Sequence, residues 1–482
     1  MTAPYDADLV IVGMGSAGMT AADFAAQLGL RVVVVERARV GGDCLWTGCV
    51  PSKALIAAAR VAHDMRHADR LGLPATDPPI DLAAVWRRVR AVRDEIAAGD
   101  DDPARFVAKG VDIRTGTARL VGPNEVAITA AGDAAATRVS TRFVLLCTGS
   151  RPAVPTIPGL DAAGYLTSET LFELEEIPSR LVFVGGGPIA VELAQACRRL
   201  GIETTVLQRG ARLLPREEPE LADQVVAALR ADGVDVRTGV DVTAVEPGPV
   251  VIGRVDGVEQ RWPTDAIVVA TGRRVDVDGL GLAELGVATN ERGVIVDGRM
   301  RTTVASIYAA GDVAGRELFT HAAGYQAVRA VRDAFFPGSG KADALVPWAT
   351  FTDPELAHAG LTEAEAREHF GERHVRVHRW SLAHNDRAHT DGSSGGIVLV
   401  EKVGLLRSRL VGAHVLADHA GELIGELVLA IERGLTASEL GGMVHVYPTI
   451  ATSIQQLGGQ AAMDRATSYR WLMRGARARR RR

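Results

Sequence analysis

Residues 41–53 read Gly41-Gly42-Asp43-Cys44-Leu45-Trp46-Thr47-Gly48-Cys49-Val50-Pro51-Ser52-Lys53 and hold two of the four cysteines. In a straight α-helix, five residues of rise would separate the two Cα atoms by about 7.5 Å. A disulfide tolerates only roughly 4.4–6.8 Å. The stretch must therefore bend if Cys44 and Cys49 are to pair, and its three glycines permit the unusual backbone angles that a bend needs.

Two further residues of this stretch suit redox chemistry. Pro51 fits the first turn of a helix, and Lys53 places a cation beside the sulfurs, which lowers a thiol pKa. The alternatives are half of a zinc site or two buried structural cysteines. Zinc prefers tighter cysteine pairs with a second pair or histidines at suitable spacing, and Cys147 and Cys197 stand singly. The pattern therefore favours a redox disulfide and no metal site.

A dinucleotide-binding fingerprint precedes this stretch. A buried strand is predicted over residues 9–12, followed by a glycine-rich turn, an alanine-rich helix ending near Leu28, and a second strand over residues 31–35 that ends at an acidic residue. Such glycines let the backbone approach a pyrophosphate at a helix N-terminus, and the acid binds a ribose hydroxyl. Glycines that serve packing alone are the alternative. The residues concerned are Gly13, Gly15, Gly18 and Glu36.

The same pattern recurs 172 residues later. A strand is predicted over residues 181–184, a helix runs through Leu200, and a strand follows over residues 204–207. The glycine-rich turn of this second copy has Gly185, Gly187 and Ala190, and the pair Gln208-Arg209 stands where the first copy has Glu36-Arg37. Two dinucleotide sites are implied.

Together, the cysteine stretch and the two fingerprints resemble the flavin-dependent pyridine nucleotide-disulfide oxidoreductases. That family includes dihydrolipoamide dehydrogenase, glutathione reductase and mercuric reductase, and matching features run from about Val10 to Gln456. The resemblance implies that Cys49 is the thiolate facing the flavin and that Cys44 exchanges with the substrate. Lys53 would then lie next to the flavin, paired with Glu192 of the second fingerprint's helix. A plain surface glutamate is the alternative for Glu192.

The two fingerprints differ where a nucleotide is selected. Glu36 suits the adenosine ribose of FAD, whereas Gln208 does not repel a 2′-phosphate. Arg209, Arg212 and Arg216 follow closely enough to attract one. The second site is therefore expected to prefer NADPH, with NADH as the alternative if Gln208 accepts both.

The resemblance also assigns residues outside the fingerprints. Each half ends in a strand and a turn, around residues 143–150 and 266–273, where the family's chain crosses between its FAD and NAD(P) domains. A later segment, residues 306–312, resembles the second FAD motif. Thr320 and its neighbours resemble the segment under the flavin ring, where a histidine could equally be a cap or a core residue. The further cofactor-binding residues implied are Gly42, Thr148, Gly149, Gly272, Gly311, Asp312 and His321.

The resulting fold expectation is an α/β protein. It has two Rossmann-like domains, for FAD and NAD(P), and a C-terminal α+β interface domain that forms a homodimer with a shared active site. The predicted boundaries are residues 1–150 and 276–344 for the FAD domain, 151–275 for the NAD(P) domain, 345–465 for the interface domain and 466–482 for an arginine-rich tail. In the interface domain, residues 396–400 and 410–415 alternate as antiparallel strands do, and residues 420–433 are typical of an apolar helix.

The sequence departs from the family near its end. Many members that reduce disulfides carry His-x-His-Pro-Thr followed by Glu, in which the second histidine is a general base. Here Tyr447 takes the place of that base and Thr452 the place of its glutamate. A phenol with a pKa near 10 is a poor base at neutral pH. His445 is the alternative. Residues 385–388 resemble mercuric-reductase-like members, but the sequence has no cysteine after Cys197.

Bulk properties narrow the setting only slightly. The formal charge is −5, so electrostatics name no partner. No export signal or membrane span is expected, and a cytoplasmic reductase passing electrons to a small acceptor, a disulfide or soft metal ion, is predicted. One rival is a quinone reductase or diaphorase that does not need the dithiol. The other is a redox sensor whose arginine tail touches a membrane surface or nucleic acid, although no nucleic-acid partner is expected.

Overall fold

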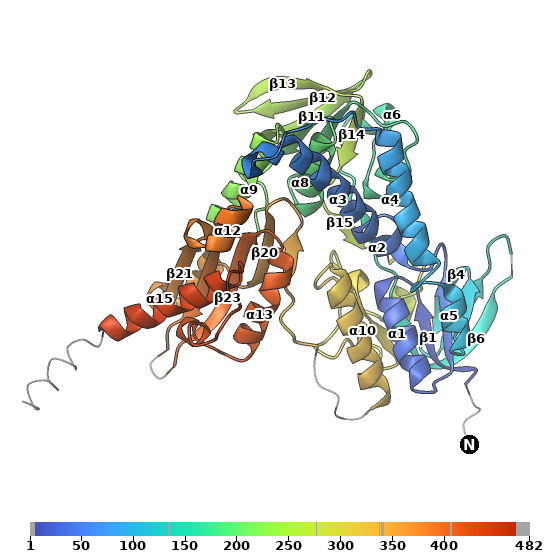
Figure 1. Cartoon of the computed structure of the whole chain (residues 1–482). Coiled ribbons are helices and arrows are strands. Elements are labelled where there is room, and N and C mark those ends of the chain that lie inside the picture. Colours follow the sequence, from blue (N-terminus) through green and yellow to red (C-terminus); the bar gives the residue numbers. More distant parts are fainter. Residues whose placement is uncertain are drawn as a thin grey trace, which may run out of the picture. The chain divides into compact units, whose positions relative to one another are not determined.

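The computed structural model describes residues 5–133, 135–275, 277–336, 338, 342–404 and 407–468 (Figure 1). It divides into two compact units. The first comprises residues 1–58, 80–185 and 242–343, and the second comprises residues 59–79, 186–241 and 344–482. The domain boundaries given above stay predictions. The arginine-rich tail lies, from residue 469 onward, outside the described residues.

A seven-stranded sheet forms the centre of the first unit, in the order β3-β2-β1-β6-β5-β4 with β18 also paired to β6. The strands β3, β2, β1, β6 and β18 pair in parallel, and β5 and β4 extend the sheet as antiparallel strands. The bounds are β1 Ala7–Val12, β2 Val32–Glu36, β3 Asp112–Thr115, β4 Thr117–Gly122, β5 Glu125–Thr129, β6 Thr137–Leu146 and β18 Ile307–Ala309.

Helices pack against this sheet. Helix α1 (Ser16–Gln27) contacts both β1 and β2, and it lies beside α10 (Thr320–Phe335), as Figure 1 shows. Covered parallel strands are expected to be continuously apolar, and Val10, Ile11 and Val34 are indeed completely buried. The strands and the helix predicted for the first fingerprint are confirmed. The other helices near the site are α2 Gly42–Trp46, α3 Cys49–Arg66, α4 Leu82–Ala97 and α5 Pro103–Ala108.

Smaller strand pairs complete the first unit. The strands β7 and β15 are antiparallel, so the two chain crossings predicted from the sequence lie side by side. The strands β8 and β14 are parallel, and β11, β12 and β13 form a separate three-stranded sheet. Their bounds are β7 Ser150–Pro152, β8 Arg180–Val184, β11 Asp241–Glu246, β12 Val250–Val255, β13 Val258–Pro263, β14 Ala266–Val269 and β15 Arg273–Val275.

The second unit holds the rest of the second fingerprint and the C-terminal sheet. The strands β9 (Glu203–Gln208) and β10 (Asp235–Thr238) are parallel, with α8 (Pro188–Arg199) and α9 (Pro219–Ala231) beside them in sequence. The C-terminal sheet has the order β19-β20-β23-β22-β21 and is antiparallel. Its strands are β19 Trp348–Thr350, β20 Glu355–Gly360, β21 Val375–Ser381, β22 Gly396–Lys402 and β23 Arg409–Ala417.

The apolar helix predicted after this sheet is α13 (Ala420–Glu432), which packs on β20 and β23. The antiparallel sheet, the helix and the α/β fold class with a Rossmann-like parallel sheet are therefore confirmed. The remaining helices of the C-terminal segment are α11 Glu363–Phe370, α12 Asp386–Asp391, α14 Ala437–Leu440 and α15 Thr452–Ser468. Among the described residues, no helix has both the length and the apolar character that a bilayer crossing requires.

Candidate active site

The cysteine stretch bends between two helices, as its spacing required. Helix α2 ends at Trp46 and α3 begins at Cys49, and the N-terminal turn is made by Gly41 and Gly42 with φ angles of 102° and 59°. Gly48 does not adopt a positive φ. A Cβ atom at Gly48 would lie 3.0 Å from the backbone oxygen of Asp43, so this glycine provides space rather than an unusual backbone angle.

The bend brings the two thiols together. In the structure both cysteines are free thiols, with Cys44 half-buried and Cys49 more exposed, and they hydrogen-bond to each other. The Sγ atom of Cys49 also lies 3.5 Å from the hydroxyl oxygen of Thr320 at the start of α10. One sulfur pair and one hydroxyl from a distant part of the sequence therefore form a single cluster.

The two thiols differ in acidity because one donates and the other accepts. The hydrogen bond from Cys44, then that from Thr320 and the charge of Lys53, lower the pKa of Cys49 to about 6, although burial opposes them. The hydrogen bond to Cys49 and then burial raise the pKa of Cys44. At neutral pH the reduced pair therefore consists of a Cys49 thiolate and a Cys44 thiol, and the thiolate is the nucleophilic form.

This arrangement predicts a role for the Thr320 hydroxyl. Replacing Thr320 by valine keeps the side-chain shape but removes the donor, so the pKa of Cys49 should rise and its alkylation by iodoacetamide at pH 6.5 should slow several-fold. In the wild-type reduced protein the alkylation rate should increase with pH around a midpoint near 6, because the thiolate appears above the lowered pKa. Thr320→Ser, which retains the hydroxyl, is the control. Equal rates for all three proteins would contradict the prediction.

Sequence reasoning missed several polar residues of this site. The hydroxyl groups of Ser16 and Thr320 both hydrogen-bond to Cys44, and Arg273 pairs with Asp43 at 3.1 Å. The Arg273 Nε atom also lies 3.5 Å from an Asp312 carboxylate oxygen. Each missed residue directly neighbours or lies within a recognised motif, but only the fold shows which way its side chain points.

The other two cysteines are packing residues, as predicted. Cys147 directly follows β6 and Cys197 lies in α8, with 6% and 0% of their surfaces exposed. Burial raises the pKa of both thiols, that of Cys197 to about 12. Buried neutral thiols of this kind are inert.

The first glycine turn fits an approaching pyrophosphate. Gly15 and Gly42 face each other, since a Cβ on Gly42 would lie 2.7 Å from the Gly15 Cα atom. A Cβ on Gly18 would lie 2.0 Å from the Gly13 backbone oxygen, so α1 packs closely on the turn. The Glu36 carboxylate accepts a hydrogen bond from the Met14 backbone N–H at 2.6 Å, which places the acid at the turn, as a ribose-binding acid requires.

Further polar groups fit the rest of FAD. The Thr148 hydroxyl oxygen is buried and has no hydrogen-bond partner among the described residues, an arrangement that a bound polar group would satisfy. Asp312 accepts a hydrogen bond from the Ser150 hydroxyl. His321 is exposed and stacks on Phe319 with ring centroids 5.5 Å apart, so it is not a core residue. The roles of Gly149, Gly272 and Gly311 stay predictions.

The second glycine turn is open for a nucleotide. A Cβ on Gly187 would meet no atom within 4 Å, whereas Gly185 packs against the Ala270 backbone oxygen and Ala190 is buried. Gln208 ends β9, and its side chain lies against Gly186. The residues therefore fit a pyridine nucleotide, with Gln208 beside the turn.

The three candidate cations for a 2′-phosphate differ in their surroundings. Arg212 pairs with Asp223 at 2.6 Å, and the Arg216 guanidinium lies over the Trp348 ring, 4.7 Å from its centroid. Arg209 is exposed, and no contact of its side chain occurs within the part of the chain that the structure describes. Arg209 is therefore the cation most available to a phosphate.

Glu192 is not a plain surface residue. Only 6% of its surface is exposed, and its carboxylate accepts a hydrogen bond from the Phe351 backbone N–H at 2.9 Å. This contact ties α8 to the segment that opens the C-terminal sheet. The predicted pairing of Glu192 with Lys53 stays a prediction.

The two candidate proton-transfer residues lie in the second unit. The Tyr447 hydroxyl donates to Asp386 at 2.7 Å, which raises the pKa of the phenol, so it is protonated at neutral pH. The His445 ring is turned toward Glu426, with 3.0 Å between its Nε2 atom and a carboxylate oxygen. Neither residue thereby acquires the properties of the histidine base that disulfide-reducing members carry.

Comparison with known proteins agrees with this geometry. Residues 7–329 match the family model of pyridine nucleotide-disulphide oxidoreductases, and residues 346–457 match that of their dimerisation domain, which supports a homodimer.

Among curated relatives, a mercuric reductase of Streptomyces lividans is 37% identical over 93% of this chain and 94% of its own. A dihydrolipoyl dehydrogenase of Thermus scotoductus is 35% identical over 93% and 96%. A Cu(II) complex of the HOCl-induced flavoprotein disulfide reductase RclA from Escherichia coli superposes with a TM-score of 0.81 at 27% identity, covering 94% of this chain and 99% of that one. The chain belongs to the pyridine nucleotide-disulfide oxidoreductases, a family of enzymes that depend on FAD and a pyridine nucleotide.

Proposed function

We propose that this enzyme passes electrons from NADPH, through FAD and the Cys44–Cys49 pair, to a small acceptor that is a disulfide or a soft metal ion. The observation that carries the proposal is the thiol pair itself. Cys49 has a pKa of about 6 and its partner has a raised one. A structural pair of cysteines has no need of this difference, whereas a dithiol that reacts at neutral pH does.

FAD, when bound, accepts the electron pair of the reduced nicotinamide and delivers it to the disulfide. Thr320 and Lys53 then stabilise the Cys49 thiolate by a hydrogen bond and by charge. Cys44 retains its proton because its pKa is raised. Since Cys44 also lines a cavity beside α1, it is the sulfur that an acceptor meets.

Differential alkylation tests this proposal. The protein is loaded with FAD and air-oxidised, then treated anaerobically with one equivalent of NADPH and alkylated. Two new thiols per protomer, mapped by mass spectrometry to Cys44 and Cys49, are expected. Cys147 and Cys197 serve as internal controls because both are buried with raised pKa values. No new alkylation at Cys44 or Cys49 would refute the proposed electron path.

The preference for NADPH rests on Gln208 and Arg209. A charge-assisted contact to a phosphate is worth more than a neutral one, so Arg209→Ala should raise the KM for NADPH about tenfold, which corresponds to 1.4 kcal/mol. The KM for NADH should change less than twofold. Arg212→Ala is the matched control, because Arg212 is already paired with Asp223. Equal effects of Arg209→Ala on both nucleotides would argue against a 2′-phosphate contact.

A further inference from the structure

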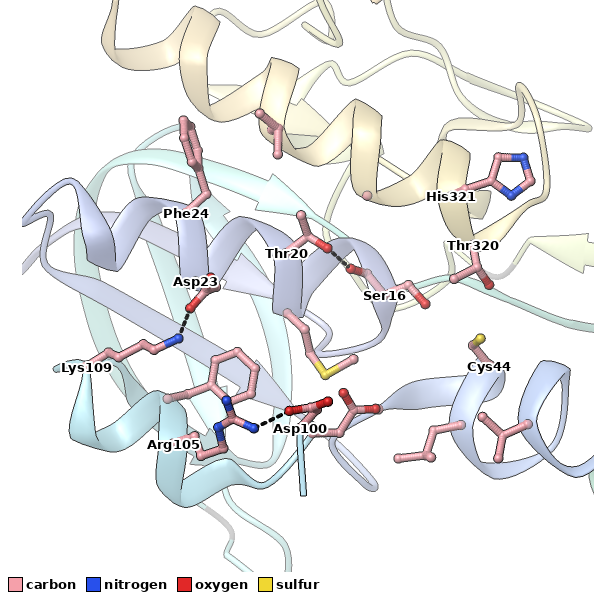
Figure 2. A pocket seen from close by; sticks show the side chains of 18 of the residues that line it. Ser16, Thr20, Asp23, Phe24, Cys44, Asp100, Arg105, Lys109, Thr320 and His321 are labelled. Atoms are coloured by element: carbon pink, nitrogen blue, oxygen red, sulfur yellow. Dashed lines mark hydrogen bonds and ion pairs between the residues drawn. The ribbon is translucent and has the colours of Figure 1, made fainter. Parts of the chain in front are cut away.

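A cavity of about 720 Å³ lies beside the redox thiol in the first unit. Residues of α1 and the start of α10 line it together with the cysteine stretch and residues 100–109. In Figure 2, Cys44, Thr320 and Ser16 gather at one end of the cavity, and the ion pair of Lys109 with Asp23 lies away from them. An acceptor that reaches Cys44 through this cavity passes between these groups.

The charges of the cavity favour a cation. Its two cationic side chains are already neutralised, because Lys109 pairs with Asp23 and Arg105 pairs with Asp100 (Figure 2). A third carboxylate, that of Asp101, is half-buried and has no hydrogen bond or ion pair with any described residue. Its pKa is raised, first by burial and then by the charge of Asp100. An anionic acceptor would find no uncommitted lysine or arginine here, whereas a cation would relieve the exposed negative charge of Asp101.

The sulfur atoms of the cavity favour a soft cation. Of the residues that line it, Met19 and Cys44 carry sulfur, one as a thioether and the other as the redox thiol. Thioether and thiolate ligands select soft metal ions. The described residues contain no group of three or more histidine, cysteine or acidic side chains that could hold a metal. A metal ion in this cavity would therefore be a substrate in transit rather than a resident ion.

The second unit adds no neighbouring base to this picture, since Tyr447 is hydrogen-bonded as a donor and its pKa is raised. Reduction of a disulfide acceptor produces a thiolate that must take up a proton. Reduction of a metal ion requires electrons but no proton. An acceptor of the second kind does not depend on the missing histidine base.

We propose that the cavity admits a thiophilic metal cation as the electron acceptor, attracted by Asp101 and guided by the Met19 thioether to Cys44. This inference rests on the proposed function. With Cu(II) as the acceptor, the Cys44 thiol and the Cys49 thiolate together lose two electrons and one proton. The two sulfurs form the disulfide, two Cu(II) ions become two Cu(I) ions, and the proton is released to solvent.

Steady-state kinetics on the full-length FAD-loaded protein test this inference. Copper(II) chloride serves as the metal probe, with a Cu(I)-specific chelator for detection, and bis(2-hydroxyethyl) disulfide serves as an uncharged acceptor. Asp101→Asn and Met19→Leu conserve size, and each should lower kcat/KM for Cu(II) about tenfold at low ionic strength, the lower end of what electrostatic focusing achieves. The uncharged disulfide should react within twofold of the wild-type rate. Asp161→Asn and Met463→Leu, whose residues do not line the cavity, are matched controls.

The possible outcomes separate the two proposals. Unchanged Cu(II) kinetics in both variants, or an equal loss for Cu(II) and the disulfide, would overturn the cavity inference. Normal NADPH-dependent appearance of the Cys44 and Cys49 thiols without any Cu(II) reduction would also overturn it, while leaving the proposed function standing. If the thiols do not appear in the wild-type protein, both proposals fall. Selective loss with Cu(II) would support the route past Asp101 and Met19.

Discussion

Replacing Cys49 by serine should lower the NADPH-dependent reduction of a disulfide or soft metal acceptor by at least about a thousandfold, the scale of loss when an enzyme's nucleophile is removed. The reason is that the thiolate with a pKa of about 6 is the reactive form at neutral pH, and a serine hydroxyl is neither ionised nor able to form a disulfide. The measurement is steady-state NADPH oxidation with each acceptor under anaerobic conditions.

Cys197→Ala is the control for this experiment, because Cys197 is fully buried in α8 and its thiol has a raised pKa. A quinone tested in parallel separates the diaphorase rival. If Cys49→Ser leaves quinone reduction unchanged, that acceptor takes electrons from the flavin without the dithiol. If Cys49→Ser also leaves disulfide and metal reduction unchanged, the dithiol mechanism is wrong.

Replacing Gly18 by alanine should destabilise the first unit and release its flavin. The added Cβ would lie 2.0 Å from the Gly13 backbone oxygen, so α1 would have to move away from the turn that receives the pyrophosphate. Overpacking of this kind costs about 1–3 kcal/mol and sometimes more. The expected results are a lower midpoint of thermal unfolding and a flavin content well below one per protomer.

The second fingerprint supplies a matched control for Gly18→Ala. Gly187→Ala adds the same methyl group in a glycine-rich turn where no atom lies within 4 Å of it. Its flavin content and unfolding midpoint should stay close to those of the wild-type protein. The same small change in both variants would mean that the close packing of α1 on the turn is not what Gly18 provides.

The sequence predicted much of the fold because its strongest patterns are local. The strands β1 and β2 and the helix α1 were expected within one or two residues, since a buried apolar run, a glycine turn and an alanine-rich helix follow one another directly. The antiparallel pair β22–β23 was also expected from its alternation. Gly48 was misjudged, because close approach to the Asp43 backbone depends on packing rather than on the residue's own dihedral preference.

The candidate site was less predictable because its polar contacts join distant segments. Thr320 lies 271 positions from Cys49 in sequence, yet its hydroxyl lies 3.5 Å from the Cys49 sulfur. Arg273 similarly reaches Asp43, and Asp101 joins Met19 and Cys44 in one cavity only after the chain folds. No local periodicity encodes such proximity, whereas the redox pair itself could be recognised from spacing and composition.

The most direct test of the electron path is an anaerobic titration of the FAD-loaded protein with NADPH, followed by its visible spectrum. We predict a long-wavelength charge-transfer band after addition of two electrons, because a Cys49 thiolate would then lie against oxidised flavin. The band should strengthen as pH rises through about 6, where the thiolate forms. Bleaching of the flavin without such a band at any pH would contradict the account, since the dithiol would then take no part in the electron path.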